Sequence, residues 1–160
     1  MELVARYFPD CSAHTLDQLE RFRLLFIEAN SKVNMVSRKD EDSLEERHIL
    51  HALAISKYIA FTPGTRVFDL GTGGGFPGLV LAIWFPEVSF VLCDSIRKKM
   101  TMVQEMSDAL GLKNVSCYNG RAEDFNGRVD FVVSRAVARV QQLWRWSHKI
   151  ISQYQHNALP

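Results

Sequence analysis

The sequence has few cysteines, no long hydrophobic run and almost no net charge. The cysteines Cys11, Cys93 and Cys117 lie far apart and show no Cys-X-X-Cys spacing, so we expect reduced thiols rather than a disulfide or a metal site. No segment has the length of a membrane-spanning helix or the pattern of a secretory signal, which predicts a cytoplasmic protein with no membrane partner. The net charge of +1 neither favours nor excludes a nucleic-acid partner.

Internal repeats and low-complexity linkers are also absent. The 160 residues, 47% hydrophobic and 23% charged, are typical of a globular protein with one domain, or with one domain and a small helical appendage. The hydrophobic pattern changes at Pro63-Gly64. We therefore expect an N-terminal helical extension over residues 1–62, packed on a sheet, and a core domain over residues 63–160.

Helical patterns fill most of the first sixty residues. Thr15 is a candidate cap for a helix whose apolar residues recur at spacings of three and four, namely Leu16, Leu19, Phe22 and Phe26. Ser43–Glu46 has the capping-box pattern that opens a second helix. The stretch Ser31–Asp40 between them is polar at both ends and is expected to be a loop.

From Arg66 onward, short apolar strands alternate with helices. Strands are expected at Arg66–Leu70, Val88–Cys93, Val115–Tyr118 and Val129–Val133, and helices at Leu79–Trp84, Ser95–Leu110 and Gln141–Ile151. This alternation predicts an α/β fold with a doubly wound, mostly parallel sheet. Such sheets bind ligands at the carboxyl ends of their strands, here Asp69–Gly78, Asp94–Ser95, Gly120–Asp124 and Ser134–Arg135.

The glycine-rich turn Asp69–Gly78 fits two cofactor motifs. Counted from Gly73 it matches Gly-X-Gly-X-X-Gly, the dinucleotide fingerprint of nicotinamide-dependent oxidoreductases. Counted from Asp69 it matches Asp-X-Gly-X-Gly-X-Gly, the pattern of S-adenosylmethionine-dependent methyltransferases. The second register begins directly after the last strand residue, Leu70, and its carboxylate would repel a pyrophosphate but attract a cationic amino group. We therefore expect S-adenosyl-L-methionine as the cofactor.

The same turn resembles that of the glucose-inhibited division protein B family. Further matches follow in the same order at Asp94–Lys99, Gly120–Asp124 and Ser134–Ala138, and upstream at Asn34 and Arg47-His48. The Phe-Pro-Gly ending of the turn and the Ser-Arg-Ala segment make the resemblance specific. It covers nearly the whole chain.

The resemblance implies a Rossmann-like methyltransferase that transfers a methyl group from S-adenosylmethionine to N7 of a guanine in 16S ribosomal RNA. Its implied partner is 16S ribosomal RNA or the bacterial small ribosomal subunit, and we expect a monomer. The residues it implies for the cofactor site are Gly71, Gly73 and Phe76 along the cofactor, Asp94 and Ser95 at its ribose, Ala122 and Glu123 near its adenine, and Arg135 facing the site.

Family members continue beyond the end of this sequence with further strands. The chain ends at Leu159-Pro160, so we expect a C-terminally truncated core whose fourth strand lies at a sheet edge. A nucleotide-binding module without chemistry, and a methyltransferase acting on another substrate, therefore remain alternatives.

No catalytic residue is assigned from the sequence. The N7 lone pair of neutral guanine needs no general base, so positioning would supply most of the catalysis. His48 and His51 have no visible third ligand, and no metal site is expected. Basic residues interleave with Trp144 and Trp146 near the end of the chain, which fits either RNA stacking or packing of the last helix.

Overall fold

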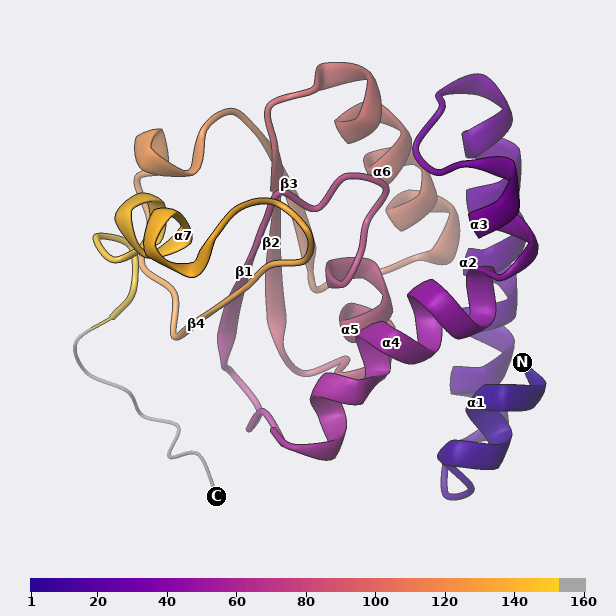
Figure 1. The fold of residues 1–160 in the computed structure, drawn as a ribbon. Helices are drawn as coiled ribbons and strands as arrows, with labels where there is room; N and C mark the ends of the chain where they lie inside the picture. The colour runs from indigo at the N-terminus through magenta and orange to yellow at the C-terminus, as the bar shows by residue number, and fades with distance from the viewer. Residues whose placement is uncertain (153–160) are drawn as a thin grey trace.

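A parallel sheet with helices on both faces forms the centre of the computed structural model, which describes residues 1–152 (Figure 1). The four strands lie in the order β3-β2-β1-β4. All three neighbouring pairs are parallel, so the predicted doubly wound α/β fold is confirmed. Their bounds are β1 Arg66–Leu70, β2 Ser89–Asp94, β3 Val115–Asn119 and β4 Phe131–Val133.

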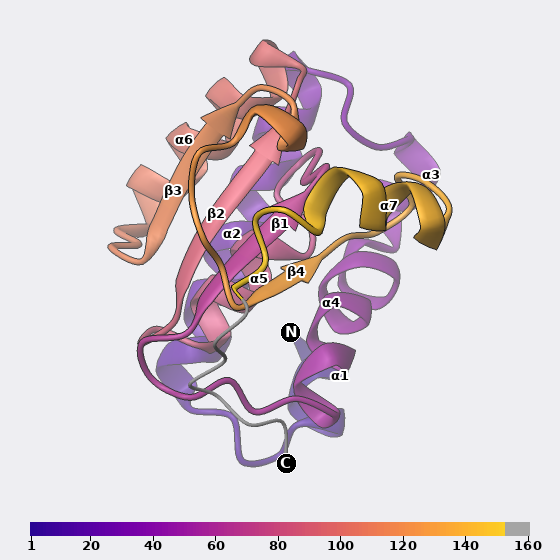
Figure 2. The ribbon, with the colours of Figure 1, turned by 90° about the vertical axis from the view of Figure 1, so that its left-hand side faces the viewer.

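Side chains of the central strands alternate between two hydrophobic clusters. Val67 packs in the larger cluster, whereas its neighbour Phe68 packs in the smaller one, as the two-residue period of a strand requires. Helices α5 (Gly78–Trp84) and α6 (Arg97–Leu110) cover the face of the larger cluster. Helix α7 (Val140–Ser147) lies on the opposite side, over β4 and β1 (Figures 1 and 2).

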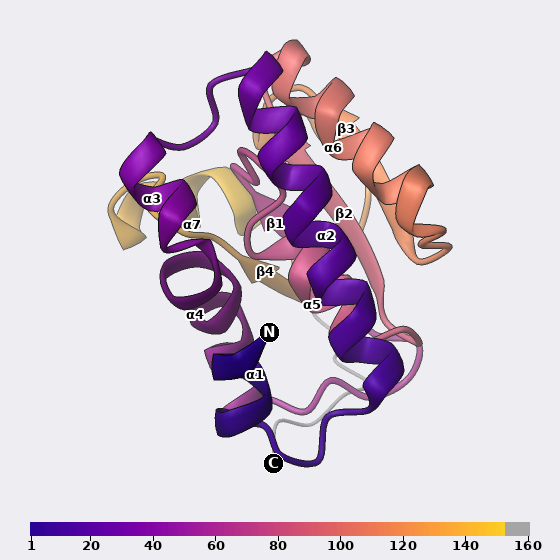
Figure 3. The same cartoon turned by 90° about the vertical axis from the view of Figure 1, so that its right-hand side faces the viewer.

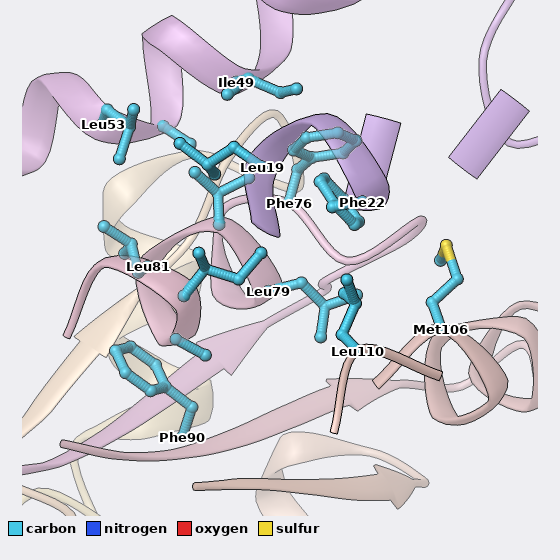
Figure 4. Close-up of a cluster of buried hydrophobic side chains, with 14 of the residues drawn as sticks. Leu19, Phe22, Ile49, Leu53, Phe76, Leu79, Leu81, Phe90, Met106 and Leu110 are labelled. Carbon is cyan, nitrogen blue, oxygen red and sulfur yellow. The ribbon is translucent and has the colours of Figure 1, made fainter. Parts of the chain in front are cut away.

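The N-terminal helices share the larger cluster with the sheet. Leu19 and Phe22 of α2 are fully buried, together with Ile49 and Leu53, against Leu79 of α5 (Figure 4). Figure 3 shows α2 running across the helices that cover this face. The elements are α1 Glu2–Tyr7, α2 Ala13–Lys32, α3 Arg38–Asp42, the π-helical turn η1 Glu45–Leu50, α4 His51–Leu53 and the 3₁₀ turn η2 Ala54–Lys57.

Several predicted boundaries are wrong in this helical region. The hydroxyl of Ser12, not that of Thr15, caps α2 by accepting a hydrogen bond from the Thr15 N–H at 3.1 Å. Part of the predicted loop forms α3, capped by Ser37. No capping hydrogen bond forms at the start of η1. None of the helices within residues 1–152 is both long and apolar enough to cross a membrane.

Candidate active site at the carboxyl edge of the sheet

A cavity of about 430 Å³ opens where β1, β2 and β3 end. This volume lies within the range of small-molecule sites, and its place at the carboxyl edge is the one expected for a doubly wound sheet. Its lining comes from the strand ends, the 3₁₀ turn η3 (Ala122–Asp124), the segment after β4 and α7. The lining residues are Leu70, Gly71, Cys93, Asp94, Ser95, Gly120, Arg121, Ala122, Glu123, Val137 and Trp146.

Asp69 organises the glycine turn from beneath. Its side chain is fully buried, and Oδ2 accepts hydrogen bonds from the Thr72 hydroxyl at 2.6 Å and the Gly78 N–H at 2.8 Å. Oδ1 has no hydrogen-bond partner among the described residues. Burial raises the pKa of Asp69 to about 7, against the two hydrogen bonds, which lower it. Asp69 therefore holds the turn and does not itself line the cavity.

At two positions of this turn, neighbouring side chains approach the backbone so closely that only glycine fits. A Cβ at Gly78 would lie 2.6 Å from Asp69 Oδ2, so a side chain there would break the contact that joins α5 to β1. Gly71 has a φ of +74°, and a Cβ there would overlap the side chain of Val137. The bare backbone at Gly71 thus lets the segment after β4 close over the turn.

Asp94 presents a carboxylate to the cavity. Its Oδ2 accepts a hydrogen bond from the Gly73 N–H at 3.0 Å, and its Oδ1 accepts one from the Ile96 N–H at 2.9 Å. Each oxygen keeps a free lone pair, which suits the paired hydroxyls of a ribose. The backbone of the glycine turn and the carboxylate at the end of β2 are therefore held as one unit.

The remaining walls combine apolar and polar groups. Ala122 and Glu123 come from η3, and Trp146 comes from α7 on the opposite face of the sheet. Cys93 also lines the cavity, but burial raises the pKa of its thiol to about 12, so it stays protonated and unreactive. A carboxylate beside bare backbone and apolar walls fits the ribose, amino-acid and adenine parts of S-adenosylmethionine.

Five of the eight cofactor residues expected from the sequence line this cavity: Gly71, Asp94, Ser95, Ala122 and Glu123. Gly73 contributes through its N–H to Asp94. Phe76 is only 3% exposed because its ring packs edge-on against Phe22 and Phe26 of α2, with centroids 5.3 and 5.1 Å away. It supports the turn from the core side and does not line the cavity.

Arg135 does not line this cavity but lies beside the N-terminal helical region. Its Nη2 lies 2.7 Å from Nδ1 of His48, its Nη1 donates to the Arg47 carbonyl at 3.2 Å, and its guanidinium lies 5.2 Å from the Phe76 ring centroid. These contacts place Arg135 in a second cavity, with His51. Among residues 1–152, no three His, Cys, Asp or Glu side chains form a group that could hold a metal ion.

Sequence reasoning did not assign Val137 or Trp146 to the cofactor cavity. Val137 was recognisable only as part of the Ser-Arg-Ala-Val-Ala segment, and nothing in that pattern shows that it folds back over Gly71. Trp146 stands among basic residues in the sequence, a pattern that fits either an RNA contact or a packing residue. The structure has Trp146 packing in the smaller cluster and lining the cavity, while Trp144 is 61% exposed.

Comparisons with known proteins identify the family of this chain. The family model for GidB, rRNA small subunit methyltransferase G, matches residues 15–157. Ribosomal RNA small subunit methyltransferase G of Cytophaga hutchinsonii is 50% identical over 159 residues, which are 99% of this chain and 77% of that protein. The Phocaeicola vulgatus protein of the same name is 51% identical over 160 residues, which are 100% of this chain and 77% of that protein.

A solved structure supports the fold. The methyltransferase from Thiobacillus denitrificans in complex with S-adenosyl-L-homocysteine superposes with a TM-score of 0.55 at 17% identity, over 73% of this chain and 52% of that one. At this identity the likeness concerns the fold alone. From the family match and the two curated relatives, the chain belongs to the GidB family of rRNA small subunit methyltransferases G.

Proposed function

We propose that this chain transfers the methyl group of S-adenosyl-L-methionine to N7 of a guanine in 16S ribosomal RNA, acting as a monomer on the RNA or on the small ribosomal subunit. The observation that carries the proposal is the cavity that is lined by Leu70 and Gly71, at the start of the glycine turn, and by Asp94, whose carboxylate is bonded to the Gly73 N–H. Family membership names the class of substrate.

Cofactor binding would use groups that the fold already holds in place. Asp94 would accept hydrogen bonds from the ribose hydroxyls. Ala122 and Glu123 would border the adenine, and the backbone at Gly71 would lie along the methionine part. When bound, S-adenosylmethionine supplies an electrophilic methyl group on a positively charged sulfur. Because the fold holds these protein groups in place before the cofactor binds, little reorganisation is needed to orient the methyl group.

The chemistry needs alignment rather than a base. The lone pair of guanine N7 forms a bond to the methyl carbon while the carbon–sulfur bond breaks and sulfur keeps its electron pair. No proton moves, and the positive charge passes from sulfur to the guanine ring. The role of the chain is to hold N7 in line with the breaking bond and to exclude water.

The test measures cofactor binding and methyl transfer separately. Calorimetric titration with S-adenosylmethionine and with NAD identifies the cofactor, and transfer of labelled methyl groups to small subunits that lack the modification identifies the substrate. We expect Asp94→Asn to weaken S-adenosylmethionine binding roughly 10- to 100-fold, as loss of a charge-assisted hydrogen bond does. Asp108→Asn, at the far end of α6 and outside the cavity, is the matched control.

Each outcome distinguishes a different function. Binding of NAD in place of S-adenosylmethionine would contradict the cofactor assignment. Cofactor binding without label in the RNA would favour a binding module or another substrate. Label that appears in RNA at a position other than guanine N7, mapped by cleavage at the modified base, would contradict the proposed product.

A further inference from the structure

A second cavity of about 320 Å³ lies beside the first, between the N-terminal helical region and the end of β4. It is lined by His51, Ala52, Ala54, Ile55, Tyr58, Pro77, Ser134 and Arg135. We propose that this cavity, hereafter the base pocket, holds the guanine that receives the methyl group; the inference rests on the proposed function. Its volume is near the lower end for small-molecule sites, about 300 to 1,000 Å³, which suits a single base.

Two segments separate the base pocket from the cofactor cavity and contribute to both. Leu70 and Gly71 line the cofactor cavity, whereas Pro77, at the end of the same turn, lines the base pocket. After β4, Val137 lines the first cavity and Ser134 the second. A reacting base must lie within about 3.5 Å of the methyl carbon, so a pocket that shares both segments is in the required place.

The strand order places the base pocket at the correct end of the cofactor cavity. From β3 to β4, the strand ends contribute first Ala122, after β3, then Asp94, then Gly71 and finally the Ser134–Val137 segment. If the ribose binds at Asp94 with adenine towards Ala122, the methionine part lies towards Gly71. The base pocket then adjoins the end that carries the methyl group.

The walls of the base pocket provide a stacking surface. Tyr58 lines the pocket and is 83% exposed, so most of its side chain is open to a ligand. Ile55 and Pro77 supply further apolar surface. Unpaired bases are commonly stacked on aromatic side chains when a protein extracts them from a stem or loop.

Two polar residues of the base pocket, Ser134 and His51, offer acceptors to one edge of guanine. A third, Arg135, can only donate, and its guanidinium is bonded to His48 and the Arg47 carbonyl. Ser134 donates its hydroxyl hydrogen to the Leu70 carbonyl at 2.8 Å, so its oxygen remains an acceptor. His51 also lines the pocket, and one nitrogen of a neutral imidazole is an acceptor. Guanine carries N–H donors on its Watson–Crick edge, and binding by that edge leaves N7 on the opposite side. Acceptors at the Watson–Crick edge also stabilise the positive charge that the guanine ring gains on methylation.

Exposed residues make the test possible without disturbing the core. Tyr58→Ala removes the stacking ring, and Ala54→Trp fills the pocket from an exposed position on η2. Tyr7→Ala and Ala60→Trp are matched controls, because Tyr7 and Ala60 are exposed and outside both cavities. The measurements are kcat/KM for methyl transfer to small subunits and the Kd for S-adenosylmethionine.

We expect Tyr58→Ala to lower kcat/KM roughly 5- to 100-fold, the range found when a base loses an aromatic stacking partner. Ala54→Trp should lower it at least as far, with the Kd for S-adenosylmethionine unchanged in both variants. The base pocket is overturned if either variant keeps the wild-type kcat/KM, or if a control loses as much. A wild-type protein that binds cofactor but never labels RNA overturns the proposed function, and the base pocket with it.

Discussion

Nη2 of Arg135 and Nδ1 of His48 lie 2.7 Å apart, joining the segment after β4 to the π-helical turn η1 across 87 residues of sequence. The Phe76 ring lies beneath both groups, 5.2 Å from the His48 ring centroid and 5.2 Å from the guanidinium carbon of Arg135. A guanidinium can only donate. Nδ1 of His48 is therefore the unprotonated acceptor, and the contact requires a neutral imidazole.

The charge state of His48 depends on this contact. Burial lowers the pKa of His48 below its ordinary 6.5, and the charge of Arg135 lowers it further. We expect Arg135→Ala to raise the pKa of His48, because the substitution removes a positive charge and admits water to the ring. NMR titration of the imidazole proton signals measures this, and the signal lost in His48→Asn identifies His48. An unchanged pKa in Arg135→Ala would contradict the assigned coupling.

The same shift has a consequence for stability. With the folded pKa below 6.5, the unfolded chain binds the proton first as the pH falls. The contribution of His48 to the free energy of unfolding is therefore present above pH 6.5 and is lost as the pH falls through the folded pKa.

Asp69 has the opposite dependence on pH. Its pKa is raised from 3.8 to about 7 by burial, so the folded chain binds the proton more tightly than the unfolded chain. Its contribution to the free energy of unfolding is complete below pH 3.8 and is lost as the pH rises through about 7. The shift corresponds to a contribution of about 4 kcal/mol.

Two variants should change the pH dependence of the free energy of unfolding in opposite ways. Asp69→Asn removes the titrating group, so urea denaturation between pH 3.8 and 7 should show a smaller fall in stability than the wild type. Thr72→Val removes a hydrogen bond that lowers the pKa of Asp69, so the pKa should rise further. The fall in the free energy of unfolding should then continue to a higher pH than in the wild type. Identical pH profiles for the wild type and Asp69→Asn would show that Asp69 is not protonated in the folded chain.

The sequence predicts what depends on local pattern. The helix predicted over Ser95–Leu110 ends at Leu110, as expected. Gly111 follows it at a φ of +71° and donates its N–H to the Asp108 carbonyl. The strand ends were predicted to meet because parallel strands place their carboxyl ends at one edge. Gly71, Asp94 and Ala122 accordingly lie around one cavity.

What the sequence does not predict depends on packing between distant segments. Helix α3, Arg38–Asp42, contains only charged residues and therefore has no apolar period that would predict a helix. Phe76 belongs to a motif that suggests ligand contact. Its position is instead decided by packing against Phe22 and Phe26 of α2, which meet it only in the folded chain. Arg135 is held by His48, and neither residue alone indicates the pair.

Substitution of Gly71 tests whether bare backbone in the glycine turn is needed for cofactor binding. Gly71 and Gly64 both have positive φ, +74° and +83°, but a Cβ at Gly64 meets nothing within 4 Å. Alanine at either position should therefore cost a similar backbone strain, about 1–2 kcal/mol. Only at Gly71 would the added methyl group displace Val137, which lines the cavity.

We therefore expect Gly71→Ala to weaken S-adenosylmethionine binding about tenfold or more, as overpacking of a close contact does, while Gly64→Ala binds like the wild type. Calorimetric titration gives both Kd values, and thermal unfolding gives the loss of stability in each variant. Equal Kd values in the two variants would show that the approach of Val137 to Gly71 does not shape the cofactor site. Because the backbone strain is matched, a difference in affinity reports on the methyl group added at Gly71, which displaces Val137 and itself enters the cavity wall.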